Sequence, residues 1–183
     1  MRGRNFPAAG TITLIKGTPN IIVDTGDVTQ RQELLDALAR HQVSVDAIAW
    51  VINTHGHLDH IGNNNLFPGA TFVLAGDLAC GGEYWTHDFA RGPLSIACDP
   101  AEPAVTVVPT AGHTDHDVSV LVPTAQGLVA VVGDLFEHGR DDEYDAWQHW
   151  SQDVPRQLAS RARIRAVADY IVPGHGDMFR TRR

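Results

Sequence analysis

The chain has 183 residues, of which 43% are hydrophobic and 20% charged, which suits a folded domain and excludes a disordered polypeptide. Its formal charge of −8 argues against broad binding of a polyanion, although one local cationic site stays compatible with it. Two cysteines without a CxxC spacing exclude a disulfide scaffold and a cysteine-rich zinc finger. No apolar run reaches the roughly 18 residues of a membrane span, and the N-terminus lacks a signal-peptide core. We therefore expect one domain over residues 1–183, in the cytoplasm or the nucleus, without a membrane partner.

Strand and helix patterns alternate along the chain, which predicts a mixed α/β domain with helices outside mostly antiparallel sheets. Residues 76–103 are predicted to form a long, irregular loop that carries several aromatic side chains. The predicted helices cover 30–40 and 151–168, and we expect the arginines of the second to lie on a solvated face. Trp147 and Trp150 are predicted to pack with Val154 and Leu158. Strands are predicted over 11–16, 20–24, 47–53, 71–75, 105–109, 117–123, 128–133 and 170–172.

A histidine-rich loop follows the apolar strand predicted over 47–53. Residues two apart in an extended loop project to the same side, so His55 and His57 can bind one metal ion. Asp59 and His60, where the chain turns, can face a second ion. Imidazoles with a carboxylate suit zinc, which we expect first, and also iron or manganese. A merely solvated loop is a poor account of four potential ligands within residues 55–60.

Three more ligand types occupy similar places in the sequence. His113, Asp134 and His175 each come just after a predicted strand and beside a glycine. Taken alone, each would be a turn residue or a helix cap. Taken together with the histidine-rich loop, they predict a metal centre at one edge of the sheets.

The chain contains the segment NIIVDTG at 20–26, the HxHxDH motif at 55–60, a later single histidine (His113), an aspartate (Asp134) and a final GHG at 174–176. Together these features resemble the metallo-β-lactamase-fold hydrolase superfamily. The order and spacing match over essentially the whole chain. The resemblance implies a four-layer αββα sandwich with two divalent metal ions at one edge of the two sheets. It implies a first ion on His55, His57 and His113, a second on Asp59, His60 and His175, and Asp134 bridging both.

Segments 60–70, 117–122, 133–137 and 167–179 resemble more closely the glyoxalase II-like branch of this superfamily, and within it a nuclease that processes histone pre-mRNA. This resemblance implies a hydrolase that uses a metal-bridging hydroxide to cleave single-stranded RNA, with Asp59 and Asp134 as the catalytic residues. Two alternatives stay open. One is a glyoxalase II-like hydrolase of a small thioester, and the other is a metal-binding protein with little catalysis.

Other residues have competing interpretations. Asp24 either orients a metal ligand or caps a turn. Tyr84 and Trp85 either stack on a substrate or seal a satellite core. His116 stands where the family commonly has GHTPGS and this chain has GHTDHD, and it either contacts substrate or lies on the surface. The expected partner is RNA or a small-molecule substrate, and the oligomeric state, including a homodimer, is left open.

Overall fold

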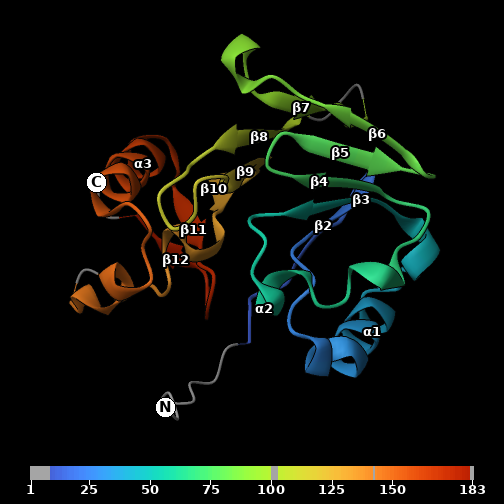
Figure 1. Ribbon diagram of the computed structural model, residues 1–183. Coiled ribbons are helices and arrows are strands. Elements are labelled where there is room, and N and C mark those ends of the chain that lie inside the picture. Colours follow the sequence, from blue (N-terminus) through green and yellow to red (C-terminus); the bar gives the residue numbers. More distant parts are fainter. Residues whose placement is uncertain (1–8, 100–102, 142, 182–183) are drawn as a thin grey trace, which may run out of the picture.

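The computed structural model describes residues 9–99, 103–141 and 143–181, and in them two six-stranded sheets lie face to face with helices outside (Figure 1). The first sheet keeps chain order: β1 (Thr13–Ile15), β2 (Asn20–Val23), β3 (Ile48–Asn53), β4 (Thr71–Leu74), β5 (Asp77–Cys80) and β6 (Glu83–Thr86). The second runs in the order β12 (Phe179–Arg180), β11 (Tyr170–Val172), β10 (Gly127–Val131), β9 (Val118–Thr124), β8 (Val105–Pro109) and β7 (Leu94–Ile96).

The alternation of apolar residues along β2 separates two layers of the core. Ile21 and Val23 face the second sheet and join the cluster between the sheets. Ile22 points the other way and packs with Leu34 and Leu38 of α1 (Arg31–Arg40). These leucines are four residues apart, so α1 covers the outer face of the first sheet with one apolar stripe.

The outer face of the second sheet is covered by α3 (Val154–Val167), through Ile164 against Ile171 and Ala130. Asp153 caps this helix by accepting a hydrogen bond from the Arg156 amide, and a proline stands in its first turn. Helix, sheet, sheet and helix thus form the expected four layers of an αββα sandwich. The remaining helices are α2 (Leu58–Ile61) and the 3₁₀ segments η1 (Val28–Gln30), η2 (Val45–Ala47), η3 (Asn64–Leu66), η4 (Phe89–Arg91), η5 (Gly133–Leu135) and η6 (Asp145–His149).

The prediction of an irregular loop over 76–103 is wrong, because this stretch contains β5, β6, η4 and β7. Gly81 and Gly82 join β5 to β6 with φ values of 58° and 86°, as a two-residue hairpin turn requires. The expectation of mostly antiparallel pairing holds for the second sheet, where only β10 and β11 are parallel among the described strands. It also holds for the first sheet, where β2, β3 and β4 are parallel but the pairs β1–β2, β4–β5 and β5–β6 are antiparallel.

The solvated arginine face predicted for 151–168 is wrong at one position. Arg161 is buried, with its guanidinium 3.1 Å from the Asp141 carboxylate. It lies between the rings of Phe136 and Trp147, at 4.1 Å and 4.2 Å from their centroids. Trp147 is buried as predicted, but the predicted packing is wrong for Trp150 and Leu158, which are 57% and 50% exposed.

Candidate metal centre

Seven histidine and aspartate side chains meet where strands of both sheets end. Because β2 and β3 are parallel, and β10 and β11 are parallel, their carboxyl ends bring the following loops to a common edge. One group of potential ligands consists of His55, His57, His113 and Asp134. Further groups consist of Asp59, His60 and His175, and of Asp134, Glu137 and His175. The structure thus brings together all seven residues predicted as metal ligands.

Asp134 lies between two sets of imidazoles and offers one carboxylate oxygen to each. Its Oδ2 is 3.6 Å from Nε2 of His55 and 3.3 Å from Nε2 of His113. Its Oδ1 is 3.1 Å from Nε2 of His60 and 3.4 Å from Nε2 of His175. This arrangement suits a carboxylate that bridges two ions.

The remaining predicted ligands complete the two sets. His57 Nδ1 is 3.0 Å from His113 Nε2, so both nitrogens face one point at which an ion could bind. Asp59 Oδ2 lies 3.7 Å from His60 Nε2 and 3.6 Å from His175 Nε2. The first ligand set, His55, His57 and His113, is therefore made of imidazoles. The second ligand set, Asp59, His60 and His175, combines imidazoles with a carboxylate.

Buried polar atoms without hydrogen-bond partners show that this cluster fits metal ions. Among the described residues, they include Nε2 of His55, Nε2 of His60 and Oδ1 of Asp134. Leaving such atoms unpaired costs about 1–3 kcal/mol each, and coordination would satisfy them. Nitrogen and carboxylate oxygen donors suit zinc, iron or manganese.

Protonation in the cluster is set by burial and by its charges. Burial lowers the pKa of His113 to about 4 and holds that of His55 well below its usual value, so both are neutral. Burial alone would lower the pKa of His60, but the carboxylates of Asp24 and Asp134 raise it to about 11. Burial alone would raise the pKa of Asp134, yet the adjacent imidazoles hold it far below its usual value.

Asp24 orients two of these histidines from behind. It directly follows β2, and its Oδ2 lies 2.8 Å from Nδ1 of His60. Its carboxylate also accepts hydrogen bonds of 2.7 Å from the amide and the hydroxyl of Thr54, and that hydroxyl lies 3.2 Å from Nδ1 of His55. Of the two interpretations of Asp24, the structure supports the orienting one.

The segment that precedes β1 holds the third orienting contact. The carbonyl of Ala9 lies 3.0 Å from Nδ1 of His175, which leaves Nε2 to face the ligand cluster. The amide of Thr11 donates to the carbonyl of Gly174 at 2.7 Å. A Cβ added at Gly174 would lie 1.8 Å from Oδ1 of Asp134, so only glycine fits there.

Glu137 belongs to the cluster and was not predicted from the sequence. Its carboxylate oxygens lie 3.7 Å from Nδ1 of His113 and 3.8 Å from Nε2 of His175. Burial and the nearby Asp134 raise the pKa of Glu137 to about 8. Its position only three residues after the predicted ligand Asp134 is the sequence signal that could have identified it.

The candidate substrate contacts lie outside these ligand groups. Tyr84 and Trp85 are exposed on β6, the edge strand of the first sheet, with β4 and β5 between them and β3. His116 is exposed in the turn after His113, where its amide donates to the Thr114 hydroxyl. Their proposed contacts with substrate stay predictions.

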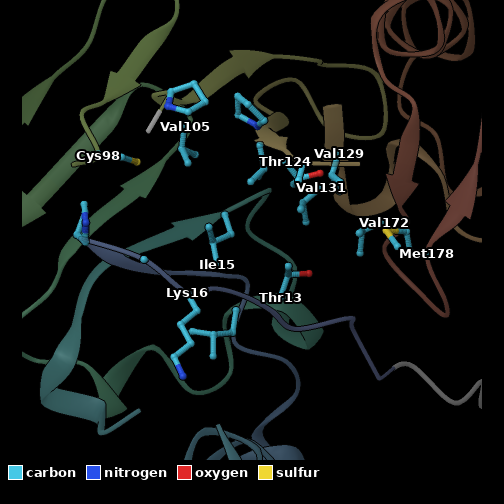
Figure 2. A pocket seen from close by; sticks show the side chains of 17 residues that line it. Thr13, Ile15, Lys16, Cys98, Val105, Thr124, Val129, Val131, Val172 and Met178 are labelled. Atoms are coloured by element: carbon cyan, nitrogen blue, oxygen red, sulfur yellow. The ribbon is translucent and has the colours of Figure 1, made fainter. Parts of the chain in front are cut away.

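Two cavities accompany the site. One of about 160 Å³ begins at Glu137 and is lined by Arg140, Tyr144 and Trp150 among others. The other, of about 700 Å³, opens between the sheets and runs from Met178 along β1, without any of the candidate metal ligands in its lining (Figure 2).

Within the described residues, no helix has the length and apolar character that crossing a membrane requires.

Comparison with known proteins identifies the family. Residues 6–76 match the metallo-β-lactamase superfamily. Metallo-β-lactamase domain-containing protein 1 of Xenopus laevis is 45% identical over 97% of this chain and 75% of its own length. The human protein of the same name is 46% identical over 89% of this chain, which corresponds to only 60% of the human protein.

Solved structures agree in fold at lower identity. A candidate metallo-β-lactamase of Thermotoga maritima is 22% identical, with a TM-score of 0.67 over 98% of this chain and 92% of that one. A metallo-β-lactamase of Cronobacter sakazakii is 18% identical, with a TM-score of 0.65 over 91% of this chain and 72% of that one. The chain belongs to the metallo-β-lactamase superfamily and is a metal-dependent hydrolase.

Proposed function

We propose that the protein is a dinuclear zinc phosphodiesterase that cleaves single-stranded RNA. The observation that carries the proposal is the position of Asp134, which offers one oxygen to each of two imidazole sets. This geometry supports two ions held side by side. The first would be bound by His55, His57 and His113, the second by Asp59, His60 and His175, and both by Asp134.

When bound, two such ions supply an activated water and positive charge next to the scissile bond. The side chains of this chain hold that arrangement in place. Asp134 and Asp59 are the proposed catalytic carboxylates: Asp134 is buried, whereas the side chain of Asp59 is 19% exposed and can reach a substrate. Asp59 is therefore the proposed acceptor of the proton that the water loses.

A phosphodiester matches this centre better than a neutral thioester does, because it brings two non-bridging oxygens to two cations. A flexible single strand can reach recessed ligands, whereas a duplex keeps its bases stacked. The resemblance of segments 60–70 and 167–179 to an RNA-processing nuclease points the same way.

The cavity that begins at Glu137 also favours a nucleotide. The exposed rings of Tyr144 and Trp150 offer stacking surfaces, and the guanidinium of Arg140, which is paired with Glu143, lies beside them. Base stacking on an aromatic side chain contributes about 1–3 kcal/mol per base.

The decisive comparison is kcat/KM on a short single-stranded RNA against kcat/KM on S-lactoylglutathione, in one buffer with the same metal. We expect faster RNA cleavage, loss of activity with a chelator, and little cleavage of duplex RNA. Thioester turnover that is faster tenfold, or about 1.4 kcal/mol in transition-state binding, would assign the glyoxalase II-like function instead. No turnover of either substrate by the metal-loaded protein would favour a metal-binding role.

Two sets of variants control this comparison. Asp134→Ala, purified identically, should lower activity by orders of magnitude and weaken metal binding with little loss of fold, which also excludes a contaminating ribonuclease. Trp85→Ala and Trp150→Ala separate the two candidate stacking surfaces. The variant that raises KM more than it lowers kcat marks the surface that binds RNA.

A further inference from the structure

An imidazole that offers one ring nitrogen to a metal ion is held in orientation when its other ring nitrogen has a hydrogen-bond acceptor. Three of the candidate ligand imidazoles have one: His60 faces Asp24, His55 faces the hydroxyl of Thr54, and His175 faces the carbonyl of Ala9. Such a partner fixes the tautomer, so that the other ring nitrogen keeps its lone pair for the ion.

His113 lacks such a partner. Its Nε2 lies 3.0 Å from Nδ1 of His57 and 3.3 Å from Oδ2 of Asp134, which places Nε2 on the metal side. Its Nδ1 therefore points away from the ions. This nitrogen is buried without a hydrogen bond to any described residue, and the residue is only 2% exposed. An unpaired N–H at this depth costs about 1–3 kcal/mol.

The carboxylate of Glu137 is the acceptor nearest to that nitrogen. Its Oε1 lies 3.7 Å from Nδ1 of His113, about 0.7 Å beyond an ordinary N–H···O hydrogen bond. The glutamate side chain has rotatable bonds that can close this gap without a backbone shift. The side chain of Glu137 is 16% exposed, so it can reach His113 while remaining largely shielded from water.

Hydrogen bonds to neighbouring residues hold the backbone of Glu137 in place. Its amide and that of His138 donate to the two carboxylate oxygens of Asp141, both at 2.9 Å. Asp141 is paired with the buried Arg161. The carbonyl of Glu137 accepts the amide of His175 at 2.9 Å, so the backbone of Glu137 is joined to the second ligand set.

We propose that Glu137 is the positioning residue of His113, accepting the Nδ1–H hydrogen bond that directs Nε2 of His113 at the first ion. Glu137 thereby does for His113 what Asp24 does for His60. The proposal concerns the metal centre and holds whatever the substrate is, so it stands or falls separately from RNA cleavage.

The test measures zinc binding by competition with a chromogenic chelator, together with ring N–H signals in NMR spectra of the zinc-loaded protein. We expect the first ligand set, with its three imidazoles, to hold the tighter zinc ion. Glu137→Ala removes the acceptor and should weaken binding of this tighter ion about 10–100-fold. Glu137→Gln should retain most of the affinity, because its amide oxygen can still accept the Nδ1–H. Glu143→Gln is the matched control: this acid is exposed on the same segment and paired with Arg140, and its loss should leave zinc affinity and the His113 signal unchanged.

The wild-type protein itself provides an independent measurement, which keeps the test decisive even where Glu137→Ala folds poorly. The Nδ1–H signal of His113 should be shifted downfield and protected from solvent exchange in the wild type and in Glu137→Gln. Wild-type affinity in Glu137→Ala, or a rapidly exchanging Nδ1–H in the wild type, would overturn the proposal. A fall from two ions to one with the tighter ion unaffected would also overturn it, because Glu137 would then be a ligand of the second ion.

Discussion

Oδ2 of Asp24 lies 2.8 Å from Nδ1 of His60, and both side chains are almost completely buried. A carboxylate can only accept here, so Nδ1 carries the proton and Nε2 is left to bind an ion. The same carboxylate accepts the amide and the hydroxyl of Thr54, which directly precedes His55. Asp24 therefore sets the ring orientation in both ligand sets from one position after β2.

Asp24→Asn should weaken metal binding about 10–100-fold while the fold is retained. An amide group in place of Oδ2 donates to Nδ1 of His60, which moves the ring proton to Nε2, on the metal side. Asparagine tolerates the φ of 57° found at this position, so the backbone need not change. Zinc titration and circular dichroism check this, with the exposed Asp46→Asn as control. Unchanged zinc affinity would mean that Asp24 only caps the turn.

Gly174→Ala should disable the centre by displacing a carboxylate. The added methyl group would lie 1.8 Å from Oδ1 of Asp134, well inside contact distance, so Asp134 must move away from its bridging position. We expect activity and metal affinity to fall by at least tenfold. Gly69→Ala is the control, because a Cβ there meets nothing within 4 Å. Equal activity of the two variants would contradict the close approach.

Two transition-metal ions should be found per chain at saturation, and their removal should lower the melting temperature. Zinc at 100 times its dissociation constant stabilises the folded state by about 2.7 kcal/mol per ion. For a chain of this size, that corresponds to about 5–11 °C per ion in melting temperature. Elemental analysis and thermal scans with and without a chelator measure both quantities. A reproducible single ion at saturation would contradict the bridging role of Asp134.

Asp117 should make stability depend on pH. Burial raises its pKa to about 6, against the hydrogen bonds it accepts from Thr114 and from the amide of Gly112. Since the folded-state pKa lies above the usual value of an aspartate, the folded state binds the proton more tightly. The resulting stabilisation is complete below about pH 4 and is lost as the pH rises through about 6.

Urea unfolding of metal-free protein between pH 4 and pH 7 measures this effect. Asp117→Asn cannot titrate, so the unfolding free energy of the wild type minus that of the variant should decrease as the pH rises. Subtracting the variant removes the contribution of the other titrating groups. A difference that stays constant or increases over this range would show that the Asp117 carboxyl group titrates normally.

The ligands of the centre could be predicted because their signals are local. His55 follows an apolar strand, Asp134 follows another, and the ends of parallel strands meet at one edge. The hairpin of β5 and β6 also had a local signal, the pair Gly81-Gly82, which was outweighed by the aromatic residues around it.

The supporting contacts could not be predicted, since they depend on distant segments. The Ala9 carbonyl that orients His175 is a backbone group, which carries no side-chain signal at all. Arg161 is buried only because Asp141, 20 residues earlier, lies against it and two aromatic rings enclose it. Periodicity places an arginine on a helix face but does not show what covers that face.

The hydrogen bond between Ala9 and His175 joins residues 166 positions apart, so it closes a loop of nearly the whole chain. During synthesis, the imidazoles of the first ligand set are all present once His113 has left the ribosome, whereas the second set waits for His175. At 5–20 residues per second, the intervening stretch takes about 3–12 s to make. The second ligand set can therefore be completed only after the loop of His175 has been made and has docked against the segment of Ala9.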